Sequence, residues 1–140
     1  EETEQNIHYE KRFKTNNFKI KNTSDAISHA SCGMAIDLEA SAIVVCSHSG
    51  MTARMVSRFR PPVDIMGLTT NEKACRKLAL SWGVTPVIVE AYPSTEVLFY
   101  IAQKTAAEVF NLKSGDKIVI TGGATNGKSG NTDLIKIETI

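Results

Sequence analysis

The sequence lacks a strong excess of charge and a long apolar run, and both absences exclude classes of partner. Its 16 basic and 15 acidic residues leave a net charge of +1, which argues against the basic surface that binds DNA or RNA. No apolar run approaches the roughly 20 residues that a membrane-spanning helix needs. We therefore expect neither nucleic acid nor a membrane among the partners of this chain.

Cysteine is scarce, and its spacing excludes further classes of site. Cys32, Cys46 and Cys75 are odd in number and far apart, without a C-x-x-C pair, which argues against a disulfide framework. The first residues also lack the basic and apolar regions of a signal peptide. We therefore expect a cytoplasmic protein whose cysteines are reduced and serve as small core residues.

Catalytic and metal-binding patterns are missing as well. His8, His29 and His48 share no metal-ligand spacing with one another or with the cysteines, and His29 is expected to be structural. The sequence has no G-x-S-x-G elbow, and Asp37 and Glu39 are too close in sequence to face each other as an acid–base pair. We predict no catalytic residue, no metal site and no cofactor in this chain.

What the sequence does contain is a regular alternation of apolar strands and amphipathic helices. Strands are expected at 42–46, 63–69, 84–89, 118–121 and 134–140, and helices at about 25–38, 52–59, 71–82 and 94–109. This alternation implies an α/β fold in three α/β/α layers, with a mostly parallel five-stranded sheet. Nine residues, 122–130, separate the last two strands and suit a hairpin, so the last strand is expected to be antiparallel.

Single residues refine these boundaries. Asn71 and Ser94 are expected to cap their helices, and Gly83 is expected as the glycine that follows a helix end. Pro86 favours an edge position for its strand, and Trp82 is expected in the core. The positions expected to face inward from the longest helix are Val97, Leu98, Ile101, Ala102, Thr105 and Val109.

Two loops of glycine and hydroxyl residues follow two of the expected strands. The first, 47–52, leads from the strand 42–46 into a helix, and the second, 122–130, leaves the strand 118–121. Such loops expose backbone N–H groups to phosphate, and a helix N-terminus adds a favourable dipole. The pair indicates recognition of a phosphorylated ligand rather than its transformation, with ordinary polar turns as the alternative.

The second loop also matches the Walker A pattern G-x-x-x-x-G-K-S, from Gly122 to Ser129. A nucleotide-binding P-loop needs a helix directly after the serine, because the helix N-terminus faces the phosphates. Here Gly130 and a run rich in β-branched residues follow, and only 11 residues remain after Ser129. We therefore expect a hairpin loop, or a phosphate-contacting loop of another architecture, and keep a small P-loop enzyme as the weaker alternative.

Several segments, in this order, resemble the C-terminal domain of pyruvate kinase. They are 25–30 (DAISHA), 42–50 (AIVVCSHSG), 56–61 (VSRFRP), 79–84 (ALSWGV), 115–121 (GDKIVIT) and 131–137 (NTDLIKI). Together they cover about residues 23–140, and the ordered block is more specific than any one motif. Residues 1–22 resemble the end of the catalytic domain and its link to this domain.

The resemblance implies a regulatory domain that does not catalyse by itself. In that family phosphoenolpyruvate and ADP become pyruvate and ATP, with Mg²⁺ and K⁺, in a separate barrel domain. The C-terminal domain holds the allosteric effector and part of a tetramer interface, so the implied partners are a phosphorylated effector, the barrel domain and further copies of the chain. By similarity, the residues at the effector phosphate are Ser47, His48, Ser49, Gly50, Thr52, Gly127, Lys128, Ser129 and Gly130.

The first loop departs from the family pattern in its charge. Members that respond to fructose 1,6-bisphosphate often carry T-K-S-G-R-S, whereas this chain has His48 and Met51 at the Lys and Arg positions. A monophosphate such as AMP or a sugar monophosphate is therefore at least as suitable an effector. Arg54, Arg58 and Arg60 follow the loop, either as a solvated face or as a source of ligand or interface charge. A free-standing phospholigand-binding module of the same fold is the alternative to a pyruvate kinase domain.

The closing strand, 134–140, is expected to be a sheet edge. Its sequence alternates Leu134, Lys136 and Glu138 with more apolar positions. Since an edge strand offers unpaired backbone groups, we expect two copies of the chain to associate there. The charges of Lys136 and Glu138 could instead protect the edge against pairing.

Overall fold

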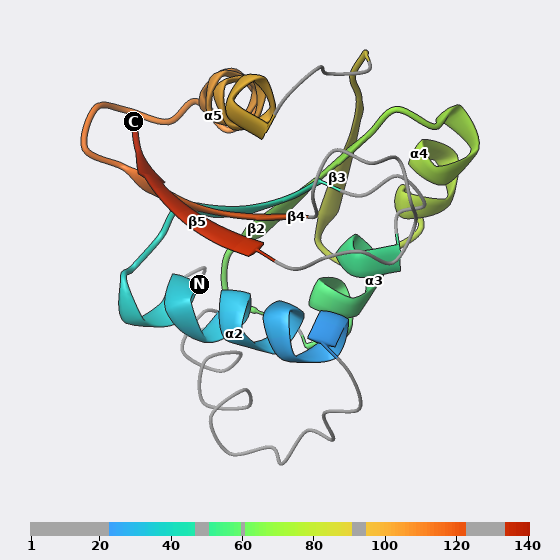
Figure 1. Cartoon of the computed structure of the whole chain (residues 1–140), viewed down its shortest axis with the longest axis horizontal. Coiled ribbons are helices and arrows are strands. Elements are labelled where there is room, and N and C mark those ends of the chain that lie inside the picture. The colour runs from blue at the N-terminus through green and yellow to red at the C-terminus, as the bar shows by residue number, and fades with distance from the viewer. Residues whose placement is uncertain (1–22, 47–50, 60, 91–94, 123–133) are drawn as a thin grey trace.

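The computed structural model describes residues 23–46, 51–59, 61–90, 95–122 and 134–140. Its elements are α2 (Thr23–Asp37), β1 (Ala42–Cys46), α3 (Met51–Arg58), β2 (Asp64–Thr69), α4 (Glu72–Leu78), β3 (Val84–Ile88), α5 (Thr95–Val109), β4 (Lys117–Gly122) and β5 (Leu134–Thr139). The strands form one sheet in the order β3-β2-β1-β4-β5. The pairs between β1 and β2, β2 and β3, and β1 and β4 are parallel, whereas β5 is antiparallel to β4. The expected α/β fold with an antiparallel last strand is confirmed (Figure 1).

Each face of the sheet has its own apolar core. Figure 1 shows α5 on one face and α2 and α3 on the other. Ile43 and Val45 of β1 pack with Phe59 in the core under α2 and α3, whereas Val44 packs with Leu98 in the core under α5. Because successive residues of a strand point to opposite faces, a strand covered on both sides needs the continuous apolar run that β1 has.

The two sheet edges are β3 and β5, on either side of the central strand β1. Pro86 lies in β3, so its predicted edge position is confirmed. Its register partner on β2 is Gly67. A Cβ atom on Gly67 would lie 2.8 Å from Cδ1 of Leu78, so the missing side chain allows α4 to pack closely on β2.

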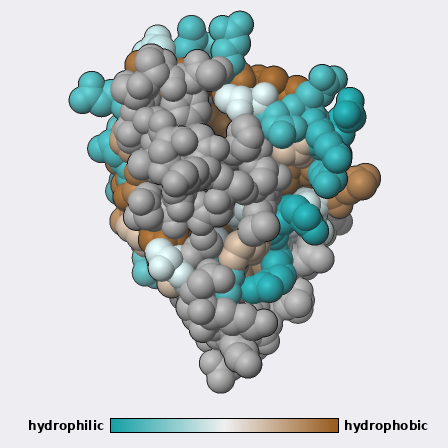
Figure 2. All heavy atoms as spheres, turned by 45° about the vertical axis from the view of Figure 1, so that its right-hand side comes forward, coloured by the Kyte–Doolittle hydropathy of each residue, from teal (hydrophilic) through white to brown (hydrophobic). Residues whose placement is uncertain are grey.

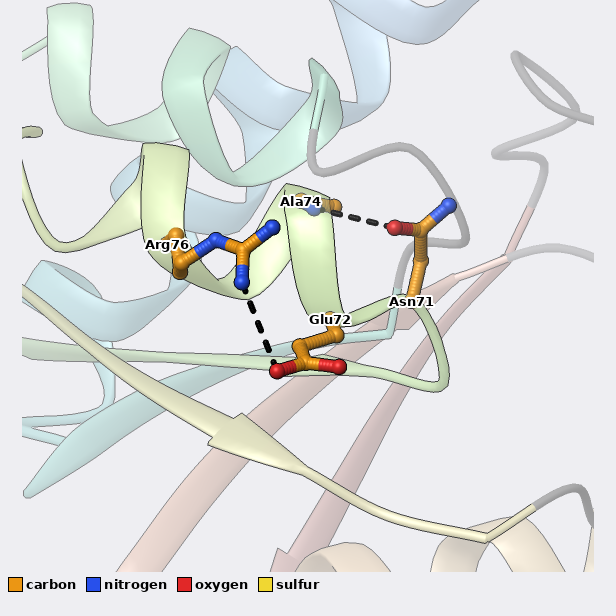
Figure 3. A network of polar contacts seen from close by, with 4 residues as sticks. All are labelled: Asn71, Glu72, Ala74 and Arg76. Atoms are coloured by element: carbon orange, nitrogen blue, oxygen red, sulfur yellow. Dashed lines mark hydrogen bonds and ion pairs between the residues drawn. The ribbon is translucent and has the colours of Figure 1, made fainter.

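The start of α4 is as the sequence predicts, but its end is not. The Asn71 side chain accepts a hydrogen bond from the backbone N–H of Ala74 at 3.1 Å, which confirms the N-cap (Figure 3). The helix ends at Leu78, so Gly83 does not follow a helix end as expected. Instead Gly83, with φ of +68°, makes a left-handed turn into β3. Leu80, two residues after the helix ends, is 91% exposed.

On the side of the molecule that carries α4, the described surface shows hydrophilic residues beside apolar patches (Figure 2). The charged residues that α4 exposes are Glu72, Lys73, Arg76 and Lys77. Arg76 pairs with Glu72 at 3.4 Å one helical turn away, and both side chains are more than two-thirds exposed (Figure 3). Exposed pairs of this kind contribute little to stability, so this surface is a solvated helix face.

Two of the three cysteines are core residues. Cys32 and Cys46 are buried, whereas Cys75 is partly buried. Burial raises the pKa of the Cys32 and Cys46 thiols to about 12, so both are neutral at physiological pH. His29 packs edge-on against Phe59, with ring centroids 5.3 Å apart, which fits the structural role expected for it.

No helix among the described residues is long and apolar enough to cross a membrane. The same residues contain no group of three or more His, Cys, Asp or Glu side chains that could hold a metal ion.

Candidate ligand site at the carboxyl ends of strands β1 and β4

The order of the strands reverses beside β1. From β1 the chain passes through α3 to β2 and through α4 to β3, and then returns through α5 to β4 on the other side of β1. The helices α3 and α5 lie on opposite faces of the sheet (Figure 1). In open parallel sheets, ligands bind outside the carboxyl ends of the strands at such a reversal. The topology therefore selects the ends of β1 and β4 as the candidate site.

The two glycine- and hydroxyl-rich loops leave the sheet from paired residues. Cys46, the last residue of β1, is the register partner of Gly122, the last residue of β4. A Cβ atom on Gly122 would lie 3.1 Å from both the Cβ and the carbonyl oxygen of Cys46. Because Gly122 has no side chain, the two strand ends can lie this close, and the loops that follow them start side by side.

The second loop is closed at its base by β5. Gly122 pairs with Leu134 in the antiparallel ladder. The buried hydroxyl of Thr121 donates a hydrogen bond to the carbonyl oxygen of Leu134 at 3.0 Å. The segment 123–133 therefore leaves the sheet and returns to it at one place, beside the end of β1.

The first loop leads directly into α3, whose first turn favours an anion. This helix begins at Met51 and has no acidic residue in its first turn. Its N-terminus carries the equivalent of roughly half a positive charge, together with backbone N–H groups that have no partner within the helix. In this turn Thr52 is only 2% exposed and Ala53 is fully buried.

The arginines that follow the loop differ in their position along α3. Arg54 lies near the N-terminal end of the helix and is exposed, where it can add positive charge to the site. Arg58 lies in the last turn, with its guanidinium 5.3 Å from the centre of the Phe59 ring, where it complements the helix dipole. Arg60 lies outside the described residues. Of the two described arginines, Arg54 is therefore the better placed for ligand charge.

The structure places the predicted site residues unevenly. Thr52 is described and lies in the first turn of α3. The predicted residues that lie outside the described part of the chain are Ser47, His48, Ser49, Gly50, Gly127, Lys128, Ser129 and Gly130. The pairing of Cys46 with Gly122 brings together the points where their two loops leave the sheet. Thr121 was not among the predicted site residues, although the sequence shows a hydroxyl residue at the end of that apolar strand.

The sequence of this chain is similar to those of known proteins. It matches the family described as "Pyruvate kinase, alpha/beta domain" over residues 25–138. It is 40% identical over 142 residues to a pyruvate kinase of Clostridium acetobutylicum, an alignment that covers 100% of this chain and 30% of that protein. It is 37% identical over 132 residues to a pyruvate kinase of Staphylococcus epidermidis, covering 93% of this chain and 23% of that protein. The chain thus spans less than a third of the length of these relatives, and it belongs to the pyruvate kinase alpha/beta domain family.

Proposed function

We propose that this chain is the regulatory domain of a pyruvate kinase and binds a phosphorylated effector at the carboxyl ends of β1 and β4. The observation that carries the proposal is the pairing of Cys46 with Gly122 at the reversal of strand order, which starts both candidate loops at one place. In the proposed complex the phosphate lies against the N–H groups of residues 49–52 at the start of α3. Residues 127–130 of the second loop are the further residues that we propose contact it.

The proposed domain is residues 23–140, with residues 1–22 as the connection to a catalytic barrel domain of the same enzyme. That barrel, with Mg²⁺ and K⁺, would convert phosphoenolpyruvate and ADP to pyruvate and ATP. The described side of the candidate site offers a helix N-terminus and backbone groups, which hold an anion but do not transfer a phosphoryl group. We therefore expect no pyruvate formation by the 140-residue chain alone.

A small P-loop enzyme is less well supported. Such an enzyme needs a helix that begins at its Walker A serine, here Ser129. The described chain resumes at Leu134 as the strand β5, which pairs with β4. A strand at this position fits a hairpin that closes a ligand loop, so the regulatory domain is the function that the fold supports better.

The effector class follows from the charge available at the site. The helix dipole and Arg54 supply modest positive charge, and His48 and Met51 stand where a Lys and an Arg would add more. We propose a monophosphate, such as AMP or a sugar monophosphate, as an effector at least as suitable as fructose 1,6-bisphosphate. Calorimetric titration of the chain with AMP, glucose 6-phosphate and fructose 1,6-bisphosphate measures the three affinities directly.

A matched pair of variants tests the location of the site. Ser49→Glu places a carboxylate beside the proposed phosphate, and the like charges should weaken binding by about tenfold or more. Ser114→Glu adds the same charge on the exposed turn before β4, at the opposite end of that strand, and should leave the affinity unchanged. Equal affinities in the two variants would move the site away from the first loop.

We also propose that the chain associates with itself through β5. This strand is an edge of the sheet, as predicted. Light scattering of the wild-type chain, alongside an Ile137→Pro variant whose fold is checked by circular dichroism, measures this association. A wild-type chain that stays monomeric at high micromolar concentration contradicts it.

A further inference from the structure

The helix α3 differs from the other described helices in the charges at its start. The first turns of α2, α4 and α5 each carry an acidic residue, namely Asp25, Glu72 and Glu96. The first turn of α3 carries none, and the only charged residues of this helix are Arg54 and Arg58. Because a cation near a helix N-terminus opposes the helix dipole, the position of Arg54 is unfavourable unless an anion lies nearby.

Arg54 is also the charged group that the start of α3 presents to solvent. Thr52 and Ala53 are buried, whereas Arg54 is exposed. Within the described part of the chain the Arg54 guanidinium has no ion-pair partner, unlike that of Arg76, which pairs with Glu72. The Arg54 guanidinium can therefore bind an anion without first breaking a contact with a described residue.

The geometry of a helix directs the Arg54 side chain toward the start of α3. Each Cα–Cβ bond of an α-helix is tilted toward the N-terminus, so a long side chain covers the turn before its own Cα atom. The Cα atom of Arg54 lies about 4.5 Å along the helix axis from that of Met51, at a rise of 1.5 Å per residue. The side chain therefore covers the first turn of α3, against which the effector phosphate is proposed to lie.

Arg58 carries the same charge on the same face of the helix but lies away from this turn. It follows Arg54 by four residues, which places it about 6 Å farther along the helix axis. Its guanidinium lies 5.3 Å from the centre of the Phe59 ring, where a cation–π contact holds it. The helix thus contains its own control for the effect of a positive charge at its start.

The charges at the start of α3 suit a phosphate monoester. The helix N-terminus is equivalent to roughly half a positive charge, and the guanidinium of Arg54 adds a full charge. A phosphate monoester carries about 1.5 to 2 negative charges at neutral pH, on three terminal oxygens. A guanidinium can donate two parallel hydrogen bonds to two such oxygens. A singly charged ester of the same shape leaves part of the positive charge unbalanced.

We propose that the guanidinium of Arg54 binds the effector phosphate and makes the site selective for phosphate monoesters over singly charged esters of the same shape. This inference rests on the proposed effector site and adds a specificity-determining residue and the ligand charge that it selects. The second negative charge of the ligand pairs with Arg54, and the first lies at the helix N-terminus.

Calorimetric titration tests the selectivity with two pairs of ligands of equal shape. AMP is compared with adenosine 5′-sulfate, and glucose 6-phosphate with glucose 6-sulfate. Arg54→Gln should weaken the binding of a phosphate ester by about fivefold and that of its sulfate ester by about twofold, because the energy of the ion pair scales with the charge of the ligand. A purely structural role would weaken both esters equally. Equal losses, or wild-type affinity in Arg54→Gln, overturn the inference.

Two further variants separate the position of the charge from its shape, with circular dichroism to confirm folding. Arg58→Gln removes the same charge from the same helix and should change each affinity by less than about twofold, since it acts from a greater distance. Arg54→Lys keeps the charge but loses the paired donors, so it should bind phosphate esters with an affinity between those of the wild type and Arg54→Gln. A loss in Arg58→Gln as large as that in Arg54→Gln contradicts a direct contact with Arg54.

Failure of the inference is distinguishable from failure of the proposed site. Phosphate-ester binding that Ser49→Glu weakens and Arg54→Gln does not would leave the site in place and exclude Arg54 as its ligand. A wild-type chain that binds neither AMP nor glucose 6-phosphate would overturn the proposed site and this inference together.

Discussion

Gly122 and Cys46 end their strands as register partners, and a Cβ atom on Gly122 would lie 3.1 Å from both the Cβ and the carbonyl oxygen of Cys46. A side chain at Gly122 would therefore make contacts that are closer than ordinary van der Waals packing. The absence of one side chain thus lets both candidate loops start from adjacent positions.

Gly122→Ala should therefore separate the ends of β1 and β4. We expect a loss of about 1–2 kcal/mol in the free energy of unfolding, as for other overpacked sites, together with weaker effector binding. Urea denaturation and calorimetry measure the two effects. Gly83→Ala is the control, since Gly83 has φ of +68° just before β3, at the opposite end of the sheet from the loops. It should lower stability and leave the affinity unchanged; a parallel loss of affinity in both variants would contradict a local role for Gly122.

Thr121→Val should loosen the base of the second loop. It removes the hydroxyl that donates to the carbonyl oxygen of Leu134 at 3.0 Å, at a cost of about 1 kcal/mol in the free energy of unfolding. Hydrogen exchange at the amides of β5 should accelerate more than exchange in β2. Thr105→Val on α5 is the isosteric control. Uniform acceleration over the whole sheet would mean that the hydroxyl contributes only to global stability.

Glu39→Gly should stabilise the protein. Glu39 follows α2 with φ of 52°, a left-handed conformation that glycine adopts without strain. The N–H of Ala40 donates to the carbonyl oxygen of Ala35 at 2.9 Å, which fixes this helix end. We expect a gain of about 0.5–1 kcal/mol in denaturant unfolding. Asp37→Gly removes the same charge within the helix and should lower stability, so a gain in both variants would point to charge rather than to backbone conformation.

The buried thiols predict a pH dependence. Their pKa rises from 9.0 to about 12, so between these values the folded chain holds protons that the unfolded chain has lost. The thiol contribution to stability is therefore complete below pH 9 and falls as the pH rises toward 12. Urea denaturation at pH 8 and pH 10 should show a smaller loss in Cys32→Ala than in the wild type. An identical loss would mean that Cys32 is not protected from ionisation.

Thiol reactivity gives a second measurement of the same burial. At pH 8 a thiol reagent should modify Cys75 of the native chain well before the other two cysteines, because only Cys75 is partly exposed. Three thiols should react at similar rates in denaturant. Equal rates in the native chain would contradict the burial of Cys32 and Cys46.

Most of the fold could be predicted because its signals are local. The apolar run of β1 and the cap at Asn71 each depend on neighbours in the sequence. The end of α4 could not, because Ala79 and Trp82 continue a helical spacing in the sequence although the helix ends at Leu78. Val97 and Val109 of α5 were expected to face inward. They are 37% and 46% exposed, so the prediction is wrong at these two positions, whereas other residues of the helix are buried.

The candidate site, too, could be predicted only in part from the sequence. Hydroxyl and glycine residues marked both loops in the sequence, whereas the pairing of Cys46 with Gly122 depends on the register between strands far apart in the chain. The same holds for the hydrogen bond from Thr121 to Leu134. Sequence patterns could identify the loops, and only the sheet topology shows that they start together.

The most direct measurement of the central claim is an NMR titration of the isotopically labelled chain with AMP and with fructose 1,6-bisphosphate. If the effector binds at the ends of β1 and β4, the largest amide shifts should fall on residues 49–53, on Gly122 and on residues 127–130, and the turn at 113–116 should stay unchanged. Shifts centred at the opposite end of the sheet, or none with either ligand at millimolar concentration, would contradict the claim.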